Sequence, residues 1–323
     1  MRSRVFVARP IQPSVVERVA QLCDVEVHPV DAPMTAGQFA QAIAQMDGVI
    51  SVGGNVSEEA LTRAPKLRVV ANIGAGYDTI DVAACTKRRI AVTNTPDVLT
   101  ESTADFAFAL LLAVSRRLFE ADHYVRDGSW KSGPFGLLWG TELHGKTLGL
   151  YGFGRIGQAM ARRGRGFGMR VLYHARNRVA PDLEGETEAQ FVGFPDLLRE
   201  SDFLSLHAPL NSESNLAFGA AQLAQTRAGA FLINTARGKI VHEAALVEAL
   251  QTGKLAGAGL DVFENEPQIH PALLEMKNVV VAPHIASATA EARLRMASLA
   301  ADNLLAVFDG RRPPSILNPE VLA

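Results

Sequence analysis

Short runs of β-branched and apolar residues alternate with longer segments rich in Ala, Leu and Arg along most of the chain. This alternation is typical of parallel sheets whose strands are joined by helices. In the first part of the chain we expect a helix at residues 14–21 and strands at 5–8, 25–28, 48–52, 69–72 and 90–93. Residues 1–98 are therefore predicted to form a compact α/β unit.

The pattern changes after residue 98 and then restarts. Residues 104–117 are almost entirely apolar and follow the capping side chains of Thr100-Glu101-Ser102-Thr103, so we expect a buried helix between two domains or at a subunit contact. A second doubly wound unit is expected over residues 99–286, and a helical pattern at 287–303 is expected to return to the first unit. The second unit should contain a helix at 156–166 and strands at 147–151, 170–173, 203–206, 230–234, 257–261 and 279–282.

Composition narrows the class of protein. Hydrophobic residues make up 48% of the 323-residue chain and charged residues 20%, which is an ordinary globular balance. A net charge of -2 disfavours a nucleic-acid or anionic-membrane partner, which usually requires a basic face. No apolar run approaches the roughly 18 residues of a membrane span, and Cys23 and Cys85 are expected to be reduced thiols, so we expect a cytoplasmic protein.

A glycine-rich turn follows the strand expected at 147–151 and opens a helix. In Gly152-Phe153-Gly154-Arg155-Ile156-Gly157, the first glycine permits a tight turn, the second admits a pyrophosphate, and the third lets the helix pack close to the strand. The helix N-terminus then offers amide groups and a positive dipole to the phosphates. A purely structural glycine turn is the alternative.

The residues at the end of the strand expected at 170–173 indicate which of the two nicotinamide dinucleotides is bound. An acidic residue there would bind the ribose of NAD, but the chain reads Tyr173-His174-Ala175-Arg176-Asn177-Arg178. Guanidinium groups suit the 2′-phosphate of NADP, so we predict NADP(H) as the preferred cofactor, with NAD(H) possible. Arg176 is the better candidate, and Arg178 could equally be a solvated loop residue.

Three polar side chains follow otherwise apolar strands: Arg237, Glu266 and His284. In doubly wound sheets ligands lie beyond the carboxyl ends of strands. Arginine can hold a carboxylate with two hydrogen bonds, and a protonated histidine beside a carboxylate can donate a proton to a developing oxyanion. This trio predicts the reduction of a 2-keto acid, although each residue alone could also be structural.

Several ordered blocks resemble the D-isomer-specific 2-hydroxyacid dehydrogenases, and the resemblance covers essentially the whole chain. Two segments favour the bacterial glyoxylate/hydroxypyruvate reductase branch, whose members also act on 2-ketogluconate: Trp139-Gly140-Thr141-Glu142-Leu143-His144-Gly145-Lys146-Thr147-Leu148-Gly149 and Tyr173-His174-Ala175-Arg176. The other blocks are Gly74-Ala75-Gly76-Tyr77-Asp78, Val98-Leu99-Thr100-Glu101-Ser102-Thr103-Ala104-Asp105, the glycine turn, His207-Ala208-Pro209-Leu210, Asn234-Thr235-Ala236-Arg237-Gly238, Leu260-Asp261-Val262-Phe263-Glu264-Asn265-Glu266-Pro267 and Pro283-His284-Ile285.

The resemblance implies two Rossmann-like, doubly wound parallel-sheet domains with an interdomain cleft. Residues 1–98 plus 287–323 would bind the substrate, and residues 99–286 would bind NADP. Arg237, Glu266 and His284 would be catalytic, and Val52, Gly53, Gly76, Arg237 and His284 would bind the substrate. The implied cofactor set is Thr103, Gly152, Gly154, Arg155, Ile156, Gly157, Arg176, Asn177, Arg178, His207, Pro209, Thr235, Ala236, Asp261 and Ser287.

The expected reaction is therefore NADPH-dependent reduction of a small 2-keto acid to a D-2-hydroxy acid by a homodimer, with no metal. The family commonly has Gly where this chain has Ala286, which is expected to shift the fit near the nicotinamide modestly. One alternative is NAD-dependent oxidation of a 3-phosphoglycerate-type acid. A second is a nucleotide-sensing corepressor without catalysis, because a fold does not determine a function.

Overall fold

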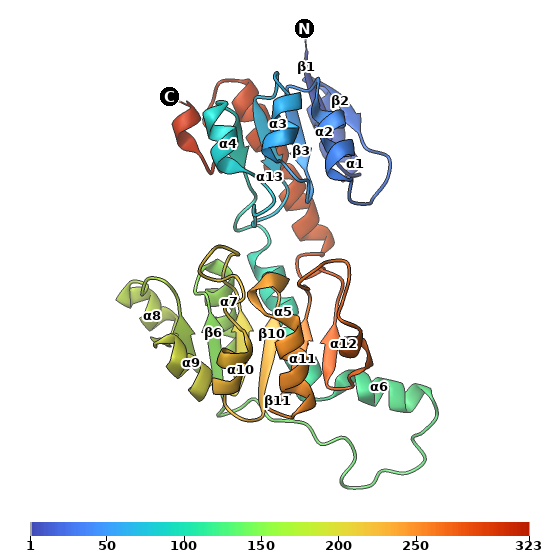
Figure 1. The fold of residues 1–323 in the computed structure, drawn as a ribbon, viewed down its shortest axis with the longest axis vertical. Coiled ribbons are helices and arrows are strands. Elements are labelled where there is room, and N and C mark those ends of the chain that lie inside the picture. Colours follow the sequence, from blue (N-terminus) through green and yellow to red (C-terminus); the bar gives the residue numbers. More distant parts are fainter. Residues whose placement is uncertain (1, 323) are drawn as a thin grey trace. The chain divides into compact units, whose positions relative to one another are not determined.

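The computed structural model describes residues 2–322, which form two compact units. Unit 1 contains the chain up to Leu99 together with the segment from Ala288 onward, and unit 2 is Thr100–Ser287. Each unit is built on its own parallel sheet (Figure 1). Within the described chain, no helix combines the length and the apolar character needed to cross a membrane. Cys23 and Cys85 are buried free thiols.

Unit 1 contains a five-stranded sheet of order β2-β1-β3-β4-β5, in which every pair is parallel. The order reverses between β1 and β3, which is the kind of switch point where ligands bind in open sheets. Its strands are β1 (Ser3–Val7), β2 (Cys23–Val27), β3 (Gly48–Ser51), β4 (Val69–Asn72) and β5 (Ala91–Thr93). Its α-helices are α1 (Pro13–Ala20), α2 (Ala36–Ile43), α3 (Glu58–Arg63), α4 (Val82–Lys87) and α13 (Ala290–Phe308), with a short 3₁₀ helix at Pro319–Leu322.

The C-terminal segment completes unit 1. Helix α13 packs on β3, β4 and β5 and beside α1, while α2, α3 and α4 bury their apolar residues against the opposite face. Buried Asn303 donates to the Asn94 carbonyl oxygen, and Asn318 accepts from the Val92 amide, so the tail is bonded to β5 and to the segment that follows it. The helix begins later than the expected residue 287, because the Thr289 hydroxyl caps it by accepting from the Ala292 amide at 3.1 Å.

Unit 2 contains a seven-stranded parallel sheet of order β12-β11-β10-β9-β6-β7-β8. Its order reverses between β6 and β9, which is the dinucleotide-binding point of a doubly wound fold. Its strands are β6 (Thr147–Tyr151), β7 (Arg170–His174), β8 (Ala189–Phe191), β9 (Phe203–Leu206), β10 (Ala230–Asn234), β11 (Leu255–Leu260) and β12 (Val279–Val281).

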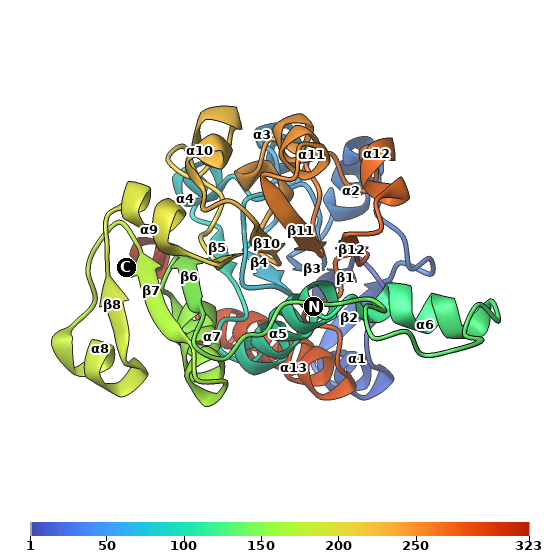
Figure 2. The ribbon, with the colours of Figure 1, turned by 90° about the horizontal axis from the view of Figure 1, so that it is seen from below.

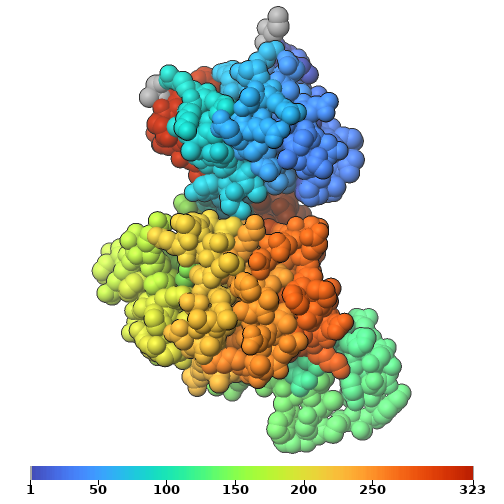
Figure 3. Space-filling model, in the orientation of Figure 1, coloured from blue at the N-terminus to red at the C-terminus, as the bar shows by residue number. Residues whose placement is uncertain are grey.

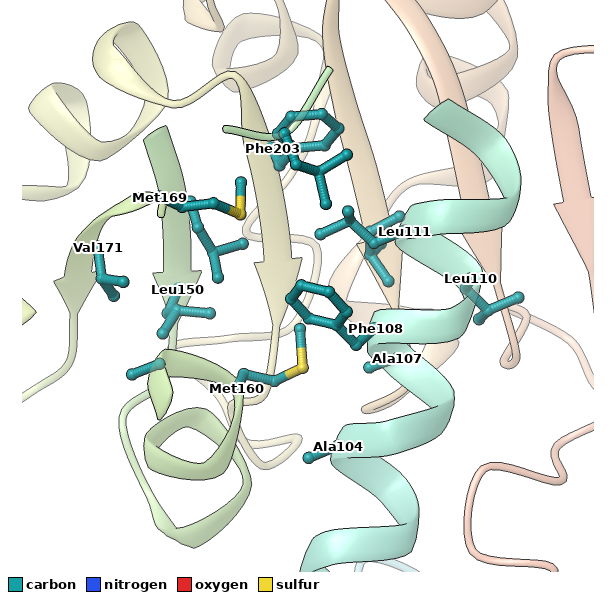
Figure 4. Close-up of a cluster of buried hydrophobic side chains, with 14 of the residues drawn as sticks. Ala104, Ala107, Phe108, Leu110, Leu111, Leu150, Met160, Met169, Val171 and Phe203 are labelled. Carbon is teal, nitrogen blue, oxygen red and sulfur yellow. The ribbon is translucent and has the colours of Figure 1, made fainter. Parts of the chain in front are cut away.

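Helices cover both faces of this second sheet (Figure 2). Helices α5 (Thr100–Ser115) and α7 (Arg155–Gly166) lie on one face, and their apolar side chains meet those of β6, β7 and β9 in the cluster of Figure 4. The opposite face is covered by α9 (Phe194–Glu200), α10 (Ala220–Gln225) and α11 (Glu243–Gln251). The remaining helices are α6 (Leu118–Arg126), α8 (Pro181–Thr187), α12 (Pro271–Glu275) and a 3₁₀ turn at Gly238–Ile240.

The start and end of α5 differ from the sequence prediction. Thr100-Glu101-Ser102-Thr103 form its first turn rather than a cap, because Thr103 is buried against the core and Glu101 pairs with Arg163 of α7. The helix ends at Ser115 rather than at residue 117, because Arg117 has a left-handed φ of 53° and begins the approach to α6. The predicted burial of this helix is confirmed by nine buried residues.

Helix α6 and the segment after it project from the body of unit 2 (Figures 1 and 3). The exposed apolar side chains of this region are Leu118, Phe119, Val125, Trp130, Phe135 and Trp139. Trp139 donates to the Phe135 carbonyl oxygen at 2.6 Å, which closes the segment into a local turn. We call residues 118–139 the projecting arm.

Candidate functional site

The glycine turn joins β6 to α7 as predicted. Gly152 has a φ of +95°, and a β-carbon there would collide with the backbone of His207 and Ala208, so only glycine fits. Gly157 packs its α-carbon against the Gly152 carbonyl oxygen, which brings α7 close to the strand. Phe153 between them is buried and stacks on Tyr173 with ring centroids 4.0 Å apart.

Open space lies before the N-terminus of α7. A β-carbon on Gly154 would have no heavy atom within 4 Å among the described residues, and no side chain in that part of the chain caps the helix. Arg155 and Ile156 form its first turn, so its backbone amides are directed toward that space. The turn therefore has the form of a phosphate cradle.

Two buried hydroxyl groups support the same interpretation. The hydroxyl groups of Thr103 and Thr235 have no hydrogen-bond partner within residues 2–322, although each atom is inaccessible to solvent. Buried polar atoms are normally paired, so an orphan is expected where a ligand supplies the missing partner. Both residues were predicted to meet the cofactor, and with the cradle they fit a dinucleotide.

The arginines beyond β7 have different surroundings. Arg178 forks onto the carboxylate of Glu184 with N–O distances of 2.9 and 2.7 Å, and the buried Tyr173 hydroxyl donates to the same carboxylate at 2.6 Å. These hydrogen bonds, first from Arg178 and then from Tyr173, lower the pKa of Glu184 to about 2. Arg176 is exposed and its Nε lies 3.9 Å from a carboxylate oxygen of Glu213, while Asn177 is exposed beside it.

His207 follows β9 on the other side of the switch point. Its Nε2 lies 2.8 Å from the Ser205 hydroxyl, and burial lowers the pKa of the ring to about 3. The ring is therefore neutral near pH 7. Pro209, two residues further, is exposed, and its carbonyl oxygen accepts from the Ser214 hydroxyl at 2.6 Å.

Arg237 is carried by a turn at the carboxyl end of β10. Buried Asn234 shapes this turn, because its side chain donates to the Arg237 carbonyl oxygen at 2.9 Å and accepts from the Ala236 amide at 3.0 Å. The Arg237 guanidinium donates to the Ala236 carbonyl oxygen at 2.8 Å. Its charge also helps lower the pKa of Glu266, which places the two side chains in one electrostatic environment.

Glu266 and His284 are in direct contact. Nδ1 of His284 lies 2.8 Å from one carboxylate oxygen of Glu266, and the other oxygen accepts from the Phe263 amide at 3.0 Å. Burial alone raises the pKa of Glu266, but the hydrogen bonds from His284 and Phe263 and the nearby positive charges hold it below its usual value. The side chain of His284 is 50% exposed, so the rest of the ring is open to a substrate.

Asp261 fixes the backbone on which His284 lies. Its buried carboxylate accepts from the amides of Ile285 and Ala286, each at 2.8 Å, and its carbonyl oxygen accepts from the His284 amide at 2.8 Å. His284 has a φ of 56°, a left-handed conformation that is uncommon for residues other than glycine. Burial raises the pKa of Asp261 despite its two amide bonds. Ala286 is buried, and Ser287 is the last residue of unit 2.

The predicted substrate loops of unit 1 lie at the carboxyl ends of β3 and β4. Buried Asn72 donates to the carbonyl oxygens of Gly74 and Gly76, and the Ser51 hydroxyl accepts from the Gly54 amide at 3.1 Å. Val52 is partly buried, and Gly53 is exposed with a φ of +67°. The sequence interpretation did not single out Asn72, Ser51 or Asn234; the signal was a polar residue at the last position of an apolar strand.

The comparisons with known proteins now decide the family. A family model described as "D-isomer specific 2-hydroxyacid dehydrogenase, NAD binding domain" matches residues 108–286. Glyoxylate reductases of Thermococcus litoralis and Korarchaeum cryptofilum are 46% and 47% identical to the chain, each covering 100% of it and 98% of the relative. The chain belongs to the D-isomer specific 2-hydroxyacid dehydrogenase family. The resemblance inferred from the sequence is thus confirmed.

Solved structures similar to this dehydrogenase support the same fold. The TT0316 protein from Thermus thermophilus is 43% identical with a TM-score of 0.91, covering 97% of this chain and 99% of that one. An NADPH-dependent glyoxylate/hydroxypyruvate reductase from Sinorhizobium meliloti, in complex with NADP and malonate, is 37% identical with a TM-score of 0.89, covering 98% and 97%. The predicted fold of two parallel-sheet α/β domains is confirmed for this dehydrogenase.

Proposed function

We propose that this dehydrogenase reduces glyoxylate, hydroxypyruvate and related small 2-keto acids, such as 2-ketogluconate, to D-2-hydroxy acids with NADPH. The observation that carries the proposal is the 2.8 Å contact between His284 Nδ1 and Glu266, beyond the strand ends that also carry Arg237. This arrangement provides a proton donor, a carboxylate that orients the donor, and a cation for the substrate carboxylate.

The catalytic step follows from the two nitrogen atoms of His284. Because the Nδ1–H group of His284 donates its hydrogen bond to Glu266 in this proposal, the Nε2–H group is left to donate to the carbonyl oxygen of the substrate. When bound, the nicotinamide cofactor would supply the hydride to the carbonyl carbon. His284 then stabilises the oxyanion and protonates it, and Glu266 limits the ring to a single orientation.

Arg237 is proposed to hold the substrate carboxylate with paired hydrogen bonds, since a guanidinium matches the geometry of a carboxylate. In unit 1, the loops at Val52, Gly53 and Gly76 are proposed to offer backbone amides to the substrate. Asn72 supports this role because it holds the carbonyl oxygens of Gly74 and Gly76, while the Gly74 amide donates to the Thr95 hydroxyl at 2.9 Å, so the turn that carries Gly76 is fixed in place.

The cofactor set is proposed to be Thr103, the glycine turn, Arg155, Ile156, His207, Pro209, Thr235, Ala236, Asp261 and Ser287, with Arg176 and Asn177 at the 2′-phosphate. Arg176 is preferred over Arg178 because Arg178 is already paired to Glu184 through two of its nitrogen atoms. The relative crystallised with NADP is consistent with this preference.

The test is an initial-rate assay of glyoxylate, hydroxypyruvate and 2-ketogluconate with NADPH and NADH. We expect turnover of at least one acid and a higher kcat/KM for NADPH. A higher kcat/KM for NADH would refute the cofactor assignment. Cofactor binding without turnover of any 2-keto acid would favour a nucleotide-sensing protein instead.

The Arg176→Asp variant tests the phosphate contact. Replacing a cation with an anion at the 2′-phosphate should raise the KM for NADPH by about 10- to 100-fold, equivalent to roughly 1.5–3 kcal/mol for a charged hydrogen bond, and leave the KM for NADH nearly unchanged. Arg199→Asp, at an exposed arginine of α9, is the matched control. An equal rise in the KM for both cofactors would show that Arg176 does not bind the 2′-phosphate.

We propose that the projecting arm mediates homodimerisation. Six large apolar side chains are exposed on this one arm, and soluble proteins usually cover such a concentration of exposed apolar surface with a partner. We propose that a second copy of this chain covers the arm, because the arm projects from unit 2 away from the groups of that unit that would bind substrate and cofactor (Figure 1).

A further inference from the structure

Glu266 lies on a loop whose position is not fixed by a strand or helix. The loop runs from the end of β11 at Leu260 to the start of α12 at Pro271, and its internal pairing is a bridge between Asn265 and Gln268. The His284–Glu266 contact of 2.8 Å therefore depends on what holds this loop in place.

Glu243, the first residue of α11, bonds the loop on both sides of Glu266. One of its carboxylate oxygens accepts from the Glu264 amide at 2.7 Å, and the other accepts from the His270 amide at 3.2 Å. The contact with Glu264 is reciprocal, because the Glu264 carboxylate accepts from the Glu243 amide at 3.0 Å. Hydrogen bonds to a carboxylate are about twice as strong as neutral ones.

The short segment that leads into α11, residues 237–243, also packs on the loop that carries Glu266, through Gly238. A β-carbon at Gly238 would collide with the carbonyl group of Phe263, so the backbone after Arg237 lies directly on the loop. Phe263 is the residue whose amide holds the second carboxylate oxygen of Glu266. Residues 237–243 thus contact the Glu266 loop at two places: Gly238 lies against Phe263, and Glu243 bonds Glu264 and His270.

We propose that Glu243 is a positioning residue that sets the contact between Glu266 and His284 by clamping the two sides of the Glu266 loop to α11. This role requires no contact between Glu243 and the substrate or the cofactor. It acts through Glu266, so the inference rests on the proposed role of the Glu266–His284 pair.

The Glu243→Gln variant keeps the size of the side chain but replaces one acceptor oxygen with an NH₂ group, so it cannot accept from both amides. We expect kcat for glyoxylate to fall by about 10- to 100-fold, which is the range for a misplaced catalytic group, while the Kd for NADPH stays within about twofold. Glu248→Gln, at an exposed glutamate of the same helix, should leave kcat unchanged.

A change in the pH profile separates positioning from general destabilisation. The hydrogen bond from His284 helps hold the pKa of Glu266 below its usual value, so a weaker contact should raise that pKa, and the rate of reduction should begin to fall at a higher pH on the acid side in Glu243→Gln than in the native enzyme. The other charged groups near the pair, Arg237 and Asp261, are unchanged in this variant, as are Glu264 and His270, whose backbone amides face Glu243. A lower Tm with native kcat and an unshifted profile would overturn the proposal.

A double-mutant cycle completes the test. In a Glu266→Gln background, Glu243→Gln should lower kcat by less than about twofold further, because the residue through which it acts is already lost. Multiplicative losses would overturn the inference while leaving the proposed function intact. Near-normal kcat in Glu266→Gln and His284→Gln themselves would overturn both. If Glu243→Gln does not fold, Glu243→Asp carries the same cycle, since it keeps the charge but is too short to reach both amides.

Discussion

His284 lies outside regular secondary structure and has a left-handed backbone conformation, which is energetically unfavourable for a histidine. Such conformations cost about 1–3 kcal/mol and persist only where the surroundings enforce them. Here Asp261 does so through its carboxylate and its carbonyl oxygen. The strain is thus offset by a neighbouring buried carboxylate, which fixes the direction in which the ring faces.

The His284→Gln variant should lower kcat by about two to four orders of magnitude, because the amide cannot donate a proton as an acid can. Binding of NADPH, followed by its fluorescence, should change little. His144→Gln, at an exposed histidine outside the projecting arm, is the control. A kcat within a factor of about three of the native value would remove His284 from the role of proton donor.

His207 makes stability depend on pH. Its pKa is about 3 in the folded protein, against an ordinary value of 6.5, so between these values the unfolded chain binds more protons. Its neutral state therefore contributes stability above about pH 6.5, and this contribution is lost as the pH falls toward 3, by about 2 kcal/mol between pH 7 and pH 5. Urea unfolding at both values should show a smaller loss in His207→Asn. Equal losses in the two proteins would contradict this assignment.

At the scale of elements, β6 and α7 pack together at the glycine turn through direct contact between their backbones rather than through side chains. Gly157 allows α7 to lie against the Gly152 carbonyl oxygen, whereas Gly166 at the other end of the same helix has no heavy atom of residues 2–322 within 4 Å of its missing β-carbon. Two glycines of one helix therefore have opposite requirements.

The Gly157→Ala variant should push α7 away from the turn. We expect a lower Tm and a Kd raised about 10-fold or more for both NADPH and NADH, corresponding to an overpacking cost of roughly 1–3 kcal/mol. Gly166→Ala should instead keep the Kd and raise stability by up to about 1 kcal/mol, because Ala restricts the unfolded chain more than Gly does. Titration by fluorescence and thermal unfolding would measure both, and unchanged binding in Gly157→Ala would refute the packing argument.

The buried strands were the most predictable elements. Residues 69–72, 147–151, 203–206 and 230–234 were assigned with the bounds that the structure has, because apolar runs between turn signals are a strong local pattern. The strand β8 and all helices other than α1, α5, α7 and α13 were not predicted, since elements of three to nine residues carry little periodicity. The helices not predicted are α2, α3, α4, α6, α8, α9, α10, α11 and α12. The segment expected at 257–261 is β11 at Leu255–Leu260, because Asp261 leaves the strand to bond the His284 turn.

The sequence identified Arg237, Glu266 and His284 but not the residues that hold them. Asp261 and Glu243 accept from backbone amides 24 and 27 residues away along the chain, and such contacts exist only after folding. Asn234 acts within its own turn, on Ala236 and Arg237, but nothing in its sequence context distinguishes it from any other polar residue at a strand end. The pairing of Arg178 with Glu184 was missed for the same reason. The residue types that carry out the chemistry can be recognised from a short stretch of sequence, whereas the residues that position them are identified only from the tertiary structure.

At the scale of the whole molecule, the projecting arm gives the strongest test of assembly. Phe119→Asp places a charge among exposed apolar groups, and a central interface residue typically contributes about 2 kcal/mol or more. We expect the native protein to sediment at twice the chain mass and the variant to dissociate at least about 30-fold more readily. Glu275→Gln, at a residue of α12, is the control. A native protein that sediments as a monomer at micromolar concentration would refute the dimer.

Unit 1 is built from both ends of the polypeptide, and this has a consequence for the newly made chain. Helix α13 covers β3, β4 and β5, and Asn303 and Asn318 complete the bonding of the edge near β5, so the first 99 residues have an uncovered apolar face until synthesis has passed residue 308. Unit 2 is continuous in sequence and contains every residue that covers its own sheet. On the ribosome the later-made unit is therefore the first that can finish folding, and the unit that is translated first must wait for the last helix.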